Sequence, residues 1–325
     1  MDGSPHRTSG DLAPTYRGSM DIGSRKTIAI TRWDLPAPKG RVVLSHGYGE
    51  HAERYRHTAR WLNDCGWSVS GMDHRGFGRS GGRRGDASGI RAFVEDLAFF
   101  LRHERHYDAR QSGGRAAADG DPDIPAFPQV LLGHSFGGLV AALDLLWHPD
   151  TLDGLILTSP VVSLRSMGLW MRVLQRAMLL LAPHRTLDLP TDKGAVCSDP
   201  EFVRKYWEDP LCHRRASAAF AQALAEGRRE LLPFGHELDR PILLLESGDD
   251  VLVDPGGSEE LWNAVRPGIL ERHRLDGFKH EILHDLRRSE AQALAGAWLD
   301  RLLAQWRGNP QALAAMSVTE TKESR

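Results

Sequence analysis

Short, continuously apolar runs alternate with longer helix-period segments along most of this 325-residue chain. The strand-like runs lack the apolar–polar alternation of half-exposed strands, which is typical of strands buried on both faces of a parallel sheet. The helix-period segments supply the layers that cover those two faces. The pattern therefore predicts an α/β fold, with a mostly parallel sheet flanked by helices.

The strand-like stretches and the helical stretches follow one another in a regular order. We predict strands over 27–33, 41–47, 67–73, 127–133, 152–159, 240–247 and 268–277. We predict helices over 54–66, 90–105, 137–148, 257–265 and 291–308. Gly66, Pro149 and Gly308 supply stop signals for three of these helices.

Two segments interrupt the alternation. Residues 111–128 form a loop rich in Gly, Pro and Asp, and residues 161–236 look mostly helical between two predicted strands. We interpret 161–236 as an inserted cap on a core built from 21–160 and 237–308. The polar ends, residues 1–20 and 309–325, are expected to be flexible.

The composition excludes several classes of protein. A formal net charge of −2 makes no case for a nucleic-acid partner. Three cysteines, Cys65, Cys197 and Cys212, without a C-x-x-C pair favour neither a disulfide framework nor a zinc site, and a reducing compartment is expected. There is no signal-like apolar segment and no run near the ~18 apolar residues that span a bilayer, so we expect a cytoplasmic protein.

One serine lies between glycines in Gly133-His134-Ser135-Phe136-Gly137, after an apolar run and before a helix-like one. A strand–turn–helix around G-x-S-x-G is the setting of a nucleophile elbow, where a strained serine needs small flanking residues. The helix N-terminus points N–H groups at the hydroxyl. The alternative is a glycine-rich turn that merely contains a serine. We predict that Ser135 is a nucleophile.

A serine hydroxyl needs a base, and the base needs an acid to orient it; on this fold they follow in the order Ser, Asp or Glu, His. The strand 240–247 runs into Gly248-Asp249-Asp250, at the sheet edge that faces an active-site crevice. We predict Asp250 as the acid. Asp249 and Asp254 are alternatives, although Asp254 also suits the cap of the next helix.

The base should follow the last strand. His280 stands after that strand and a glycine-containing turn, just before a helical segment. We predict His280 as the base. His273 lies inside the strand and His284 lies one turn beyond His280; both suit ordinary packing or surface roles.

The oxyanion of an acyl-transfer intermediate needs hydrogen-bond donors. One is expected to be the backbone N–H of Phe136, and the other that of Tyr48, in the loop after the strand 41–47. Gly47 lets that loop approach the substrate closely. His46 is interpreted as a structural histidine that bonds loop backbone. Neither a metal nor an organic cofactor is expected.

With these pieces in order, the sequence resembles the monoacylglycerol lipase and lysophospholipase group of α/β-hydrolases, which is grouped with serine aminopeptidase-like hydrolases. The likeness covers roughly residues 16–306 and rests on motifs that stand apart in the chain. They are HGYGEHAERY (46–55), DHRGFGRSGGRRG (73–85), GHSFGG (133–138), DPL (209–211), ESGDDVLVDP (246–255) and KHEILHD (279–285). The resemblance implies an α/β-hydrolase fold with an inserted helical cap, and it supports Asp250 and His280. In relatives the corresponding glycine usually stands one position earlier in the sequence than Gly248. Asp249 therefore remains an alternative to Asp250 as the acid.

The cap points to the kind of substrate. Residues 165–184 predict a helix on which Arg165, Arg172 and Arg176 share one narrow face and the remaining surface is apolar. It is either packed on the core or a lid that lines an acyl-chain pocket and touches a lipid interface. The resemblance implies monoacylglycerol, lysophospholipid or related esters as substrates.

Two other functions stay open at this point. An aminopeptidase or amidase on the same scaffold needs an anionic subsite, which Glu201, Glu208 and Asp209 in the cap could supply. A hydrolase fold that acts only as a binding protein usually lacks part of the Ser-Asp-His set, whereas here every member has a candidate.

Overall fold

A computed structural model of the chain describes residues 12–23, 27–111, 127–162, 169–189, 192–254 and 259–308. Its strands are β1 (Tyr16–Asp21), β2 (Thr27–Trp33), β3 (Arg41–Ser45), β4 (Ser68–Met72), β5 (Gln129–His134), β6 (Gly154–Thr158), β7 (Thr186–Asp188), β8 (Arg215–Ser217), β9 (Ile242–Ser247) and β10 (Leu270–Leu275). Its α-helices are α1 (Arg56–Asp64), α2 (Ile90–Gln111), α3 (Phe136–Trp147), α4 (Leu169–Leu181), α5 (Lys193–Val196), α6 (Pro200–Glu208), α7 (Ala218–Leu231), α8 (Glu259–Ala264) and α9 (Arg288–Gly308). Short 3-10 helices cover Ala52–Tyr55, Leu232–Glu237 and Ile282–His284.

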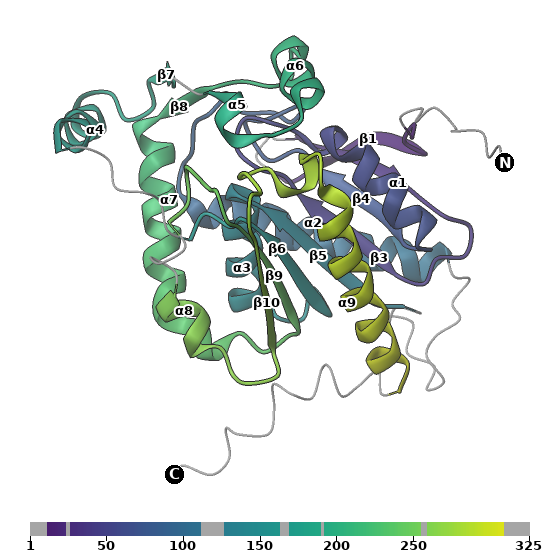
Figure 1. Cartoon of the computed structure of the whole chain (residues 1–325). Coiled ribbons are helices and arrows are strands. Elements are labelled where there is room, and N and C mark those ends of the chain that lie inside the picture. The colour runs from purple at the N-terminus through teal and green to yellow at the C-terminus, as the bar shows by residue number, and fades with distance from the viewer. Residues whose placement is uncertain are drawn as a thin grey trace, which may run out of the picture.

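Eight strands form one sheet in the order β1-β2-β4-β3-β5-β6-β9-β10 (Figure 1). Strand β2 runs antiparallel to β1 and β4, and the other neighbouring pairs are parallel. The predicted α/β architecture, a mostly parallel sheet flanked by helices, is confirmed. All seven strands predicted from apolar runs belong to this sheet.

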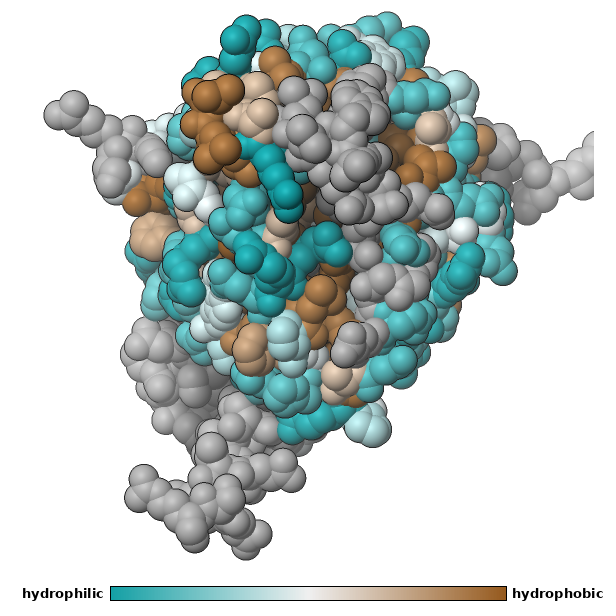
Figure 2. All heavy atoms as spheres, turned by 90° about the vertical axis from the view of Figure 1, so that its left-hand side faces the viewer, coloured by the Kyte–Doolittle hydropathy of each residue, from teal (hydrophilic) through white to brown (hydrophobic). Residues whose placement is uncertain are grey.

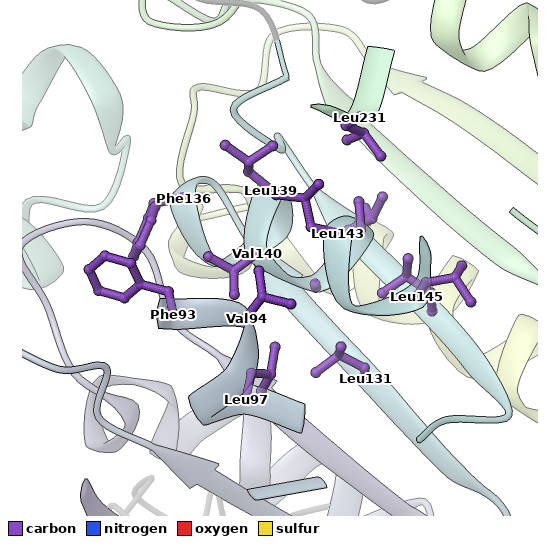
Figure 3. Close-up of a cluster of buried hydrophobic side chains, with 14 of the residues drawn as sticks. Phe93, Val94, Leu97, Leu131, Phe136, Leu139, Val140, Leu143, Leu145 and Leu231 are labelled. Atoms are coloured by element: carbon purple, nitrogen blue, oxygen red, sulfur yellow. The ribbon is translucent and has the colours of Figure 1, made fainter. Parts of the chain in front are cut away.

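The central strands are apolar throughout because both of their faces are covered. On β3 and β5, Val43 and Leu131 face the cluster formed with α2, α3, α7 and α8. Their neighbours Val42 and Leu132 face the cluster formed with α1 and α9. Figure 3 shows part of the first cluster, where side chains of α2 and α3 meet the sheet. Each fully buried Leu or Val side chain contributes about 1.5–3 kcal/mol, so the two layers hold the sheet in place.

The expectation of a flexible segment over 1–20 is wrong for Tyr16–Met20. These residues belong to β1, which pairs antiparallel with β2 in the register Tyr16↔Arg32. The strand lies at the edge of the sheet, and most of its side chains are exposed or half-buried. An edge strand of this kind needs no apolar run because its backbone pairing holds it, so composition could not identify it. Residues 1–11 and the tail 309–325 lie outside the described residues.

The segment predicted as a cap leaves the sheet after β6 and returns at β9. It contains helices, as expected, and also a short antiparallel pair of strands, β7 and β8. Its last helix, α7, packs against α2 and α3 and buries Phe220 and Ala223 in the core cluster. The predicted cap segment therefore shares the core's hydrophobic layer through α7. Most of the loop predicted over 111–128 lies outside the described residues.

The helix predicted over 165–184 is present as α4, which packs along α7. Arg176 is exposed, and at the end of the helix Leu180 and Leu181 are 85% and 84% exposed. Arg165 and the side chain of Arg172 lie outside the described residues. Figure 2, which views the face of α4, α7 and α8, shows apolar surface at the cap end. Over the ranges that the structure describes, no helix is both long and apolar enough to cross a bilayer.

Candidate active site

Ser135 occupies a sharp turn between β5 and α3. Its backbone has φ 54° and ψ −118°, a left-handed conformation that is rare for a residue with a side chain. The neighbouring glycines make room for this turn. A Cβ on Gly137 would stand 2.1 Å from the carbonyl oxygen of Ser45, and one on Gly133 would stand 2.8 Å from that of Gly137. The motif therefore encodes a strained turn with the serine at its apex.

The three side chains predicted as nucleophile, base and acid form a hydrogen-bonded row. The Oγ of Ser135 lies 2.7 Å from Nε2 of His280, and Nδ1 of His280 lies 2.7 Å from Oδ2 of Asp250. All three residues are buried. They meet because β5, β6, β9 and β10 are adjacent parallel strands, so the loops after β5, β9 and β10 open at one sheet edge.

The structure places Asp250, and not Asp249, next to the histidine. Oδ1 of Asp250 accepts hydrogen bonds from the amides of Leu252 (2.8 Å) and Val253 (2.9 Å), while Asp249 is exposed. Burial acts to raise the pKa of Asp250, but the hydrogen bond from His280 and the backbone amides outweigh it and lower the pKa. The carboxylate is therefore ionised at neutral pH.

The alternative residues lie elsewhere. Asp254 is exposed. His273 pairs with Glu271 on β10, with Nε2 2.8 Å from Oε1. His284 is buried with Nδ1 3.4 Å from the Glu281 carboxylate. None of these residues has a hydrogen bond to Ser135 among the residues that the structure describes.

The loop after β3 lies directly against the serine. A Cβ on Gly47 would stand 3.4 Å from that of Ser135 and 3.0 Å from the His134 ring. The backbone amides of Tyr48 and Phe136 donate no hydrogen bond to any residue in the described part of the chain. Both N–H groups can therefore donate a hydrogen bond to an incoming oxyanion. The Tyr48 ring is held by Phe220, with 5.2 Å between ring centroids.

Two more histidines border the row, and both are fixed as neutral rings. His46 Nδ1 lies 2.8 Å from the Gly47 carbonyl, and its Nε2 accepts from the His74 amide at 2.9 Å. His134 Nδ1 lies 3.0 Å from the Thr158 hydroxyl. Burial lowers the pKa of His46, and burial together with His280 lowers the pKa of His134 to about 3. The His46 ring thus forms hydrogen bonds with loop backbone, which is the role expected of a structural histidine.

Sequence reasoning missed a buried ionic network behind the site. Oε1 of Glu50 accepts from the Gly47 amide and from the Tyr55 hydroxyl, each at 2.7 Å, and its other oxygen pairs with Arg54. Arg54 also reaches Glu281, the residue after His280, at 3.4 Å. Burial opposes ionisation of Glu50, but the charge of Arg54 outweighs it and lowers its pKa. The motif HGYGEHAERY contains the acid and the arginine, yet nothing local indicates that the carboxylate folds back onto Gly47.

Comparisons with known proteins agree with this geometry. The family model described as serine aminopeptidase, S33, matches residues 36–287. A monoacylglycerol lipase of Mycolicibacterium smegmatis is 32% identical over 251 residues, which are 76% of this chain and 83% of that protein. Human monoglyceride lipase is 31% identical over 250 residues, which are 76% of this chain and 77% of that protein.

Solved structures show the same fold. A soluble variant of the Saccharomyces cerevisiae monoglyceride lipase, in complex with a substrate analog, superposes with a TM-score of 0.76 at 18% identity, covering 92% of this chain and 99% of that one. The Paleococcus ferrophilus monoacylglycerol lipase has a TM-score of 0.69 at 25% identity, and the match covers 85% of this chain and 98% of that one. These relatives and neighbours are carboxylic-ester hydrolases by name. Because the matched region holds Ser135, Asp250 and His280 together with the strands that position them, the chain belongs to the serine aminopeptidase S33 family of α/β-hydrolases.

Proposed function

We propose that the protein is a serine carboxylic-ester hydrolase that acts on lipid-like esters, with monoacylglycerols and lysophospholipids as the substrate class. One observation carries the proposal: the continuous row of hydrogen bonds from Asp250 through His280 to Ser135, with Ser135 at the apex of a strained elbow. This is the arrangement that an activated serine nucleophile requires.

The reaction runs through an acyl-enzyme. Ser135 Oγ attacks the ester carbonyl while Nε2 of His280 takes its proton, and Asp250 holds the Nδ1–H tautomer in place. The Phe136 and Tyr48 amides bind the oxyanion; loss of one such donor typically costs ~100–1,000-fold in kcat. His280 then protonates the leaving alcohol, and water attacks the acyl-enzyme by the same route. This chemistry needs neither a metal nor an organic cofactor.

The substrate class rests on the relatives and on the cap. The curated relatives compared above are named monoacylglycerol or monoglyceride lipases. In the cap, Leu180 and Leu181 are almost fully exposed at the end of α4. Exposed leucines of this kind suit a peripheral contact with a lipid surface, where water-insoluble esters reside.

The aminopeptidase alternative is weakened by the state of the cap acids. Glu201 pairs with Lys205 at 3.0 Å, Glu208 with Arg204 at 2.5 Å, and Asp209 with His51 at 2.8 Å. Glu201 and Glu208 each share a cation of their own helix, so neither is a dedicated partner for a substrate ammonium group. Ester hydrolysis therefore remains the better proposal.

A serine variant tests the proposal directly. Ser135→Ala should fold normally, yet lose p-nitrophenyl ester turnover and labelling by a fluorophosphonate probe. Ser70→Ala, at another buried serine, is the matched control and should keep both. Near-wild-type turnover in Ser135→Ala would refute the nucleophile. Comparing monoacylglycerols and lysophosphatidylcholine of rising chain length with aminoacyl anilides then separates esterase from aminopeptidase.

A further inference from the structure

Three side chains with metal-ligating atoms meet where the loop after β3 touches the cap. They are His51, Asp209 and Cys212, and one ligand atom from each lies within 4.8 Å of the other two. His51 follows the loop that carries Tyr48, whereas Asp209 and Cys212 follow α6. The proposed ester hydrolysis uses none of the three.

We propose that His51, Asp209 and Cys212 form a binding site for a divalent transition-metal ion, with Zn²⁺ as the best match. Imidazole nitrogen, carboxylate oxygen and thiolate sulfur are the three donor types that zinc takes in proteins, and water can fill a fourth position. A thiolate among the donors disfavours Mg²⁺ and Ca²⁺, which select oxygen ligands.

The two cap ligands are held in place by their own turn. Oδ1 of Asp209 accepts from the Leu211 amide at 2.8 Å, and the Cys212 amide donates to the Asp209 carbonyl at 3.1 Å. Oδ2 of Asp209 is left to face His51 Nε2, at 2.8 Å. Donors around a tetrahedral zinc ion stand about 3.5 Å apart, so side-chain shifts of about 1 Å would complete the site.

His51 is well suited to release its present hydrogen bond. The residue is 3% exposed, and its Nδ1 has no hydrogen-bond partner among the described residues. With the ring proton on Nδ1, the Nε2 lone pair becomes available to the ion, which then bridges His51 and Asp209 in place of the proton. Cys212 loses its thiol proton to solvent when the sulfur binds, so one proton is released at that ligand.

Both carboxylates and guanidinium groups lie near the cluster. Arg54 pairs with the carboxylates of Glu50 and Glu281. The cavity beside Asp209 and Cys212 is also lined by Arg84, Arg214 and Arg215. The charges near the cluster are therefore mixed, and the proposal rests on the donor types and their spacing.

An ion can reach the cluster from solvent. A cavity of about 420 Å³ on the cap is lined by Asp209 and Cys212, together with Tyr206, Trp207 and His213. His213 donates its backbone amide to the Gly49 carbonyl at 3.0 Å, so the cap and the loop already touch here. An ion at this point would join the two segments by a second link.

Metal binding can be measured without reference to catalysis, so the outcome is independent of the proposed esterase activity. Purified, reduced full-length protein is titrated with Co²⁺, which reports a thiolate ligand through a charge-transfer band in the near ultraviolet. Zn²⁺ should abolish the band by competition and should raise the thermal unfolding midpoint. We expect one equivalent of cobalt in the wild type.

Variants distinguish this site from adventitious binding. Cys212→Ser should lose the charge-transfer band, and Cys212→Ser and Asp209→Asn should each weaken Zn²⁺ at least about tenfold. Cys65→Ser, at another partly buried cysteine, should behave as the wild type. Circular dichroism establishes that each variant is folded. A band that persists in Cys212→Ser, or a wild-type protein without bound cobalt and without a shift in midpoint, would overturn the proposal.

Discussion

The carboxylate of Glu50 holds the backbone amide of Gly47, with 2.7 Å between Oε1 and the nitrogen. The next amide along the chain belongs to Tyr48, the proposed oxyanion donor. The position of this donor therefore depends on a buried side chain two residues further on, which Tyr55 and Arg54 hold in turn. Glu50 is a positioning residue in this arrangement, because it touches the loop and not the reacting atoms.

Removal of the Glu50 carboxylate should lower kcat more than it changes the KM for the ester substrate. We expect Glu50→Ala to lower kcat by about 100-fold with a much smaller change in KM, because the Tyr48 amide loses its support. Glu50→Gln keeps an acceptor for Gly47 and should recover part of the loss. Glu53→Gln is the control, since Glu53 is also buried but pairs with Arg17 and Arg56 instead. Equal losses of kcat in Glu50→Gln and Glu50→Ala would contradict this role.

The choice of acid can be tested by two neighbouring variants. Asp250→Asn should lower kcat about 10⁴-fold, because the amide can stabilise the wrong tautomer of His280. Asp249→Asn should stay near the wild type, since Asp249 is exposed. Ester hydrolysis by both variants is measured under the same conditions. The opposite ranking would transfer the role to Asp249.

A methyl group at the elbow should disturb the fold. In Gly137→Ala the new Cβ would stand 2.1 Å from the Ser45 carbonyl oxygen and 2.4 Å from that of His46. We expect a loss of about 1–3 kcal/mol in the free energy of unfolding, with loss of activity. Gly296→Ala, inside α9, meets only a ring carbon of Trp61 at 3.7 Å and should be neutral or stabilising by up to ~1 kcal/mol. Urea unfolding of the two variants measures the difference, and equal stabilities would contradict it.

Stability should fall as the pH drops below about 6.5, because buried neutral histidines bind a proton only when the chain unfolds. Burial, with nearby His46 and Arg75, holds the pKa of His74 well below its usual range. Above pH 6.5 the His74 ring is neutral in both the folded and the unfolded chain, and it has no effect on stability. Below pH 6.5 the ring binds a proton only in the unfolded chain, which lowers the free energy of unfolding by up to about 1.4 kcal/mol per pH unit.

His74→Phe removes this one contribution. The ring packs against Phe93 and Phe136, as a phenylalanine ring also could. The variant loses the hydrogen bond between the His74 ring and the Ser45 hydroxyl, which keeps its bond to the Gly137 carbonyl. Urea unfolding at several pH values between 6.5 and 5 should show a shallower loss of stability than in the wild type. An unchanged slope in His74→Phe would mean that the ring is protonated in the folded protein.

The exposed leucines of the cap should govern attachment to lipid. Leu180→Ser/Leu181→Ser should reduce partition onto phosphatidylcholine vesicles at least about tenfold, since burial of a leucine is worth about 1.5–3 kcal/mol. Phe99→Ser, at a 47% exposed position on α2, is the control for general loss of apolar surface. Co-sedimentation with vesicles provides the measurement. Equal losses in both variants would argue against a cap-specific contact.

Much of the molecule could be predicted because its signals are local. Continuous apolar strands and amphipathic helices specify the layers of an α/β sheet, and parallel strands bring their carboxyl ends to one edge. For that reason Ser135, Asp250 and His280 could be predicted from positions at strand ends. The glycines around Ser135 likewise predict the strained turn, in which Ser135 has a φ of 54°.

Other features depend on contacts between distant segments. Asp249 and Asp250 are adjacent and chemically alike, and only the packing of the loops after β9 and β10 decides which one meets His280. Strand β1 carries no apolar signal, because its partner β2 supplies the pairing.

The same holds for the partners of buried charges. Glu50 finds Gly47 nearby, but Arg54 meets Glu281 across 227 positions, and His51 meets Asp209 across 158. Backbone conformation and burial can be predicted from short stretches of sequence, since they follow from local sterics and hydrophobicity. Which polar group faces which is settled only when the sheet and the cap bring separate loops together, because hydrogen bonds and ion pairs act over a few ångströms.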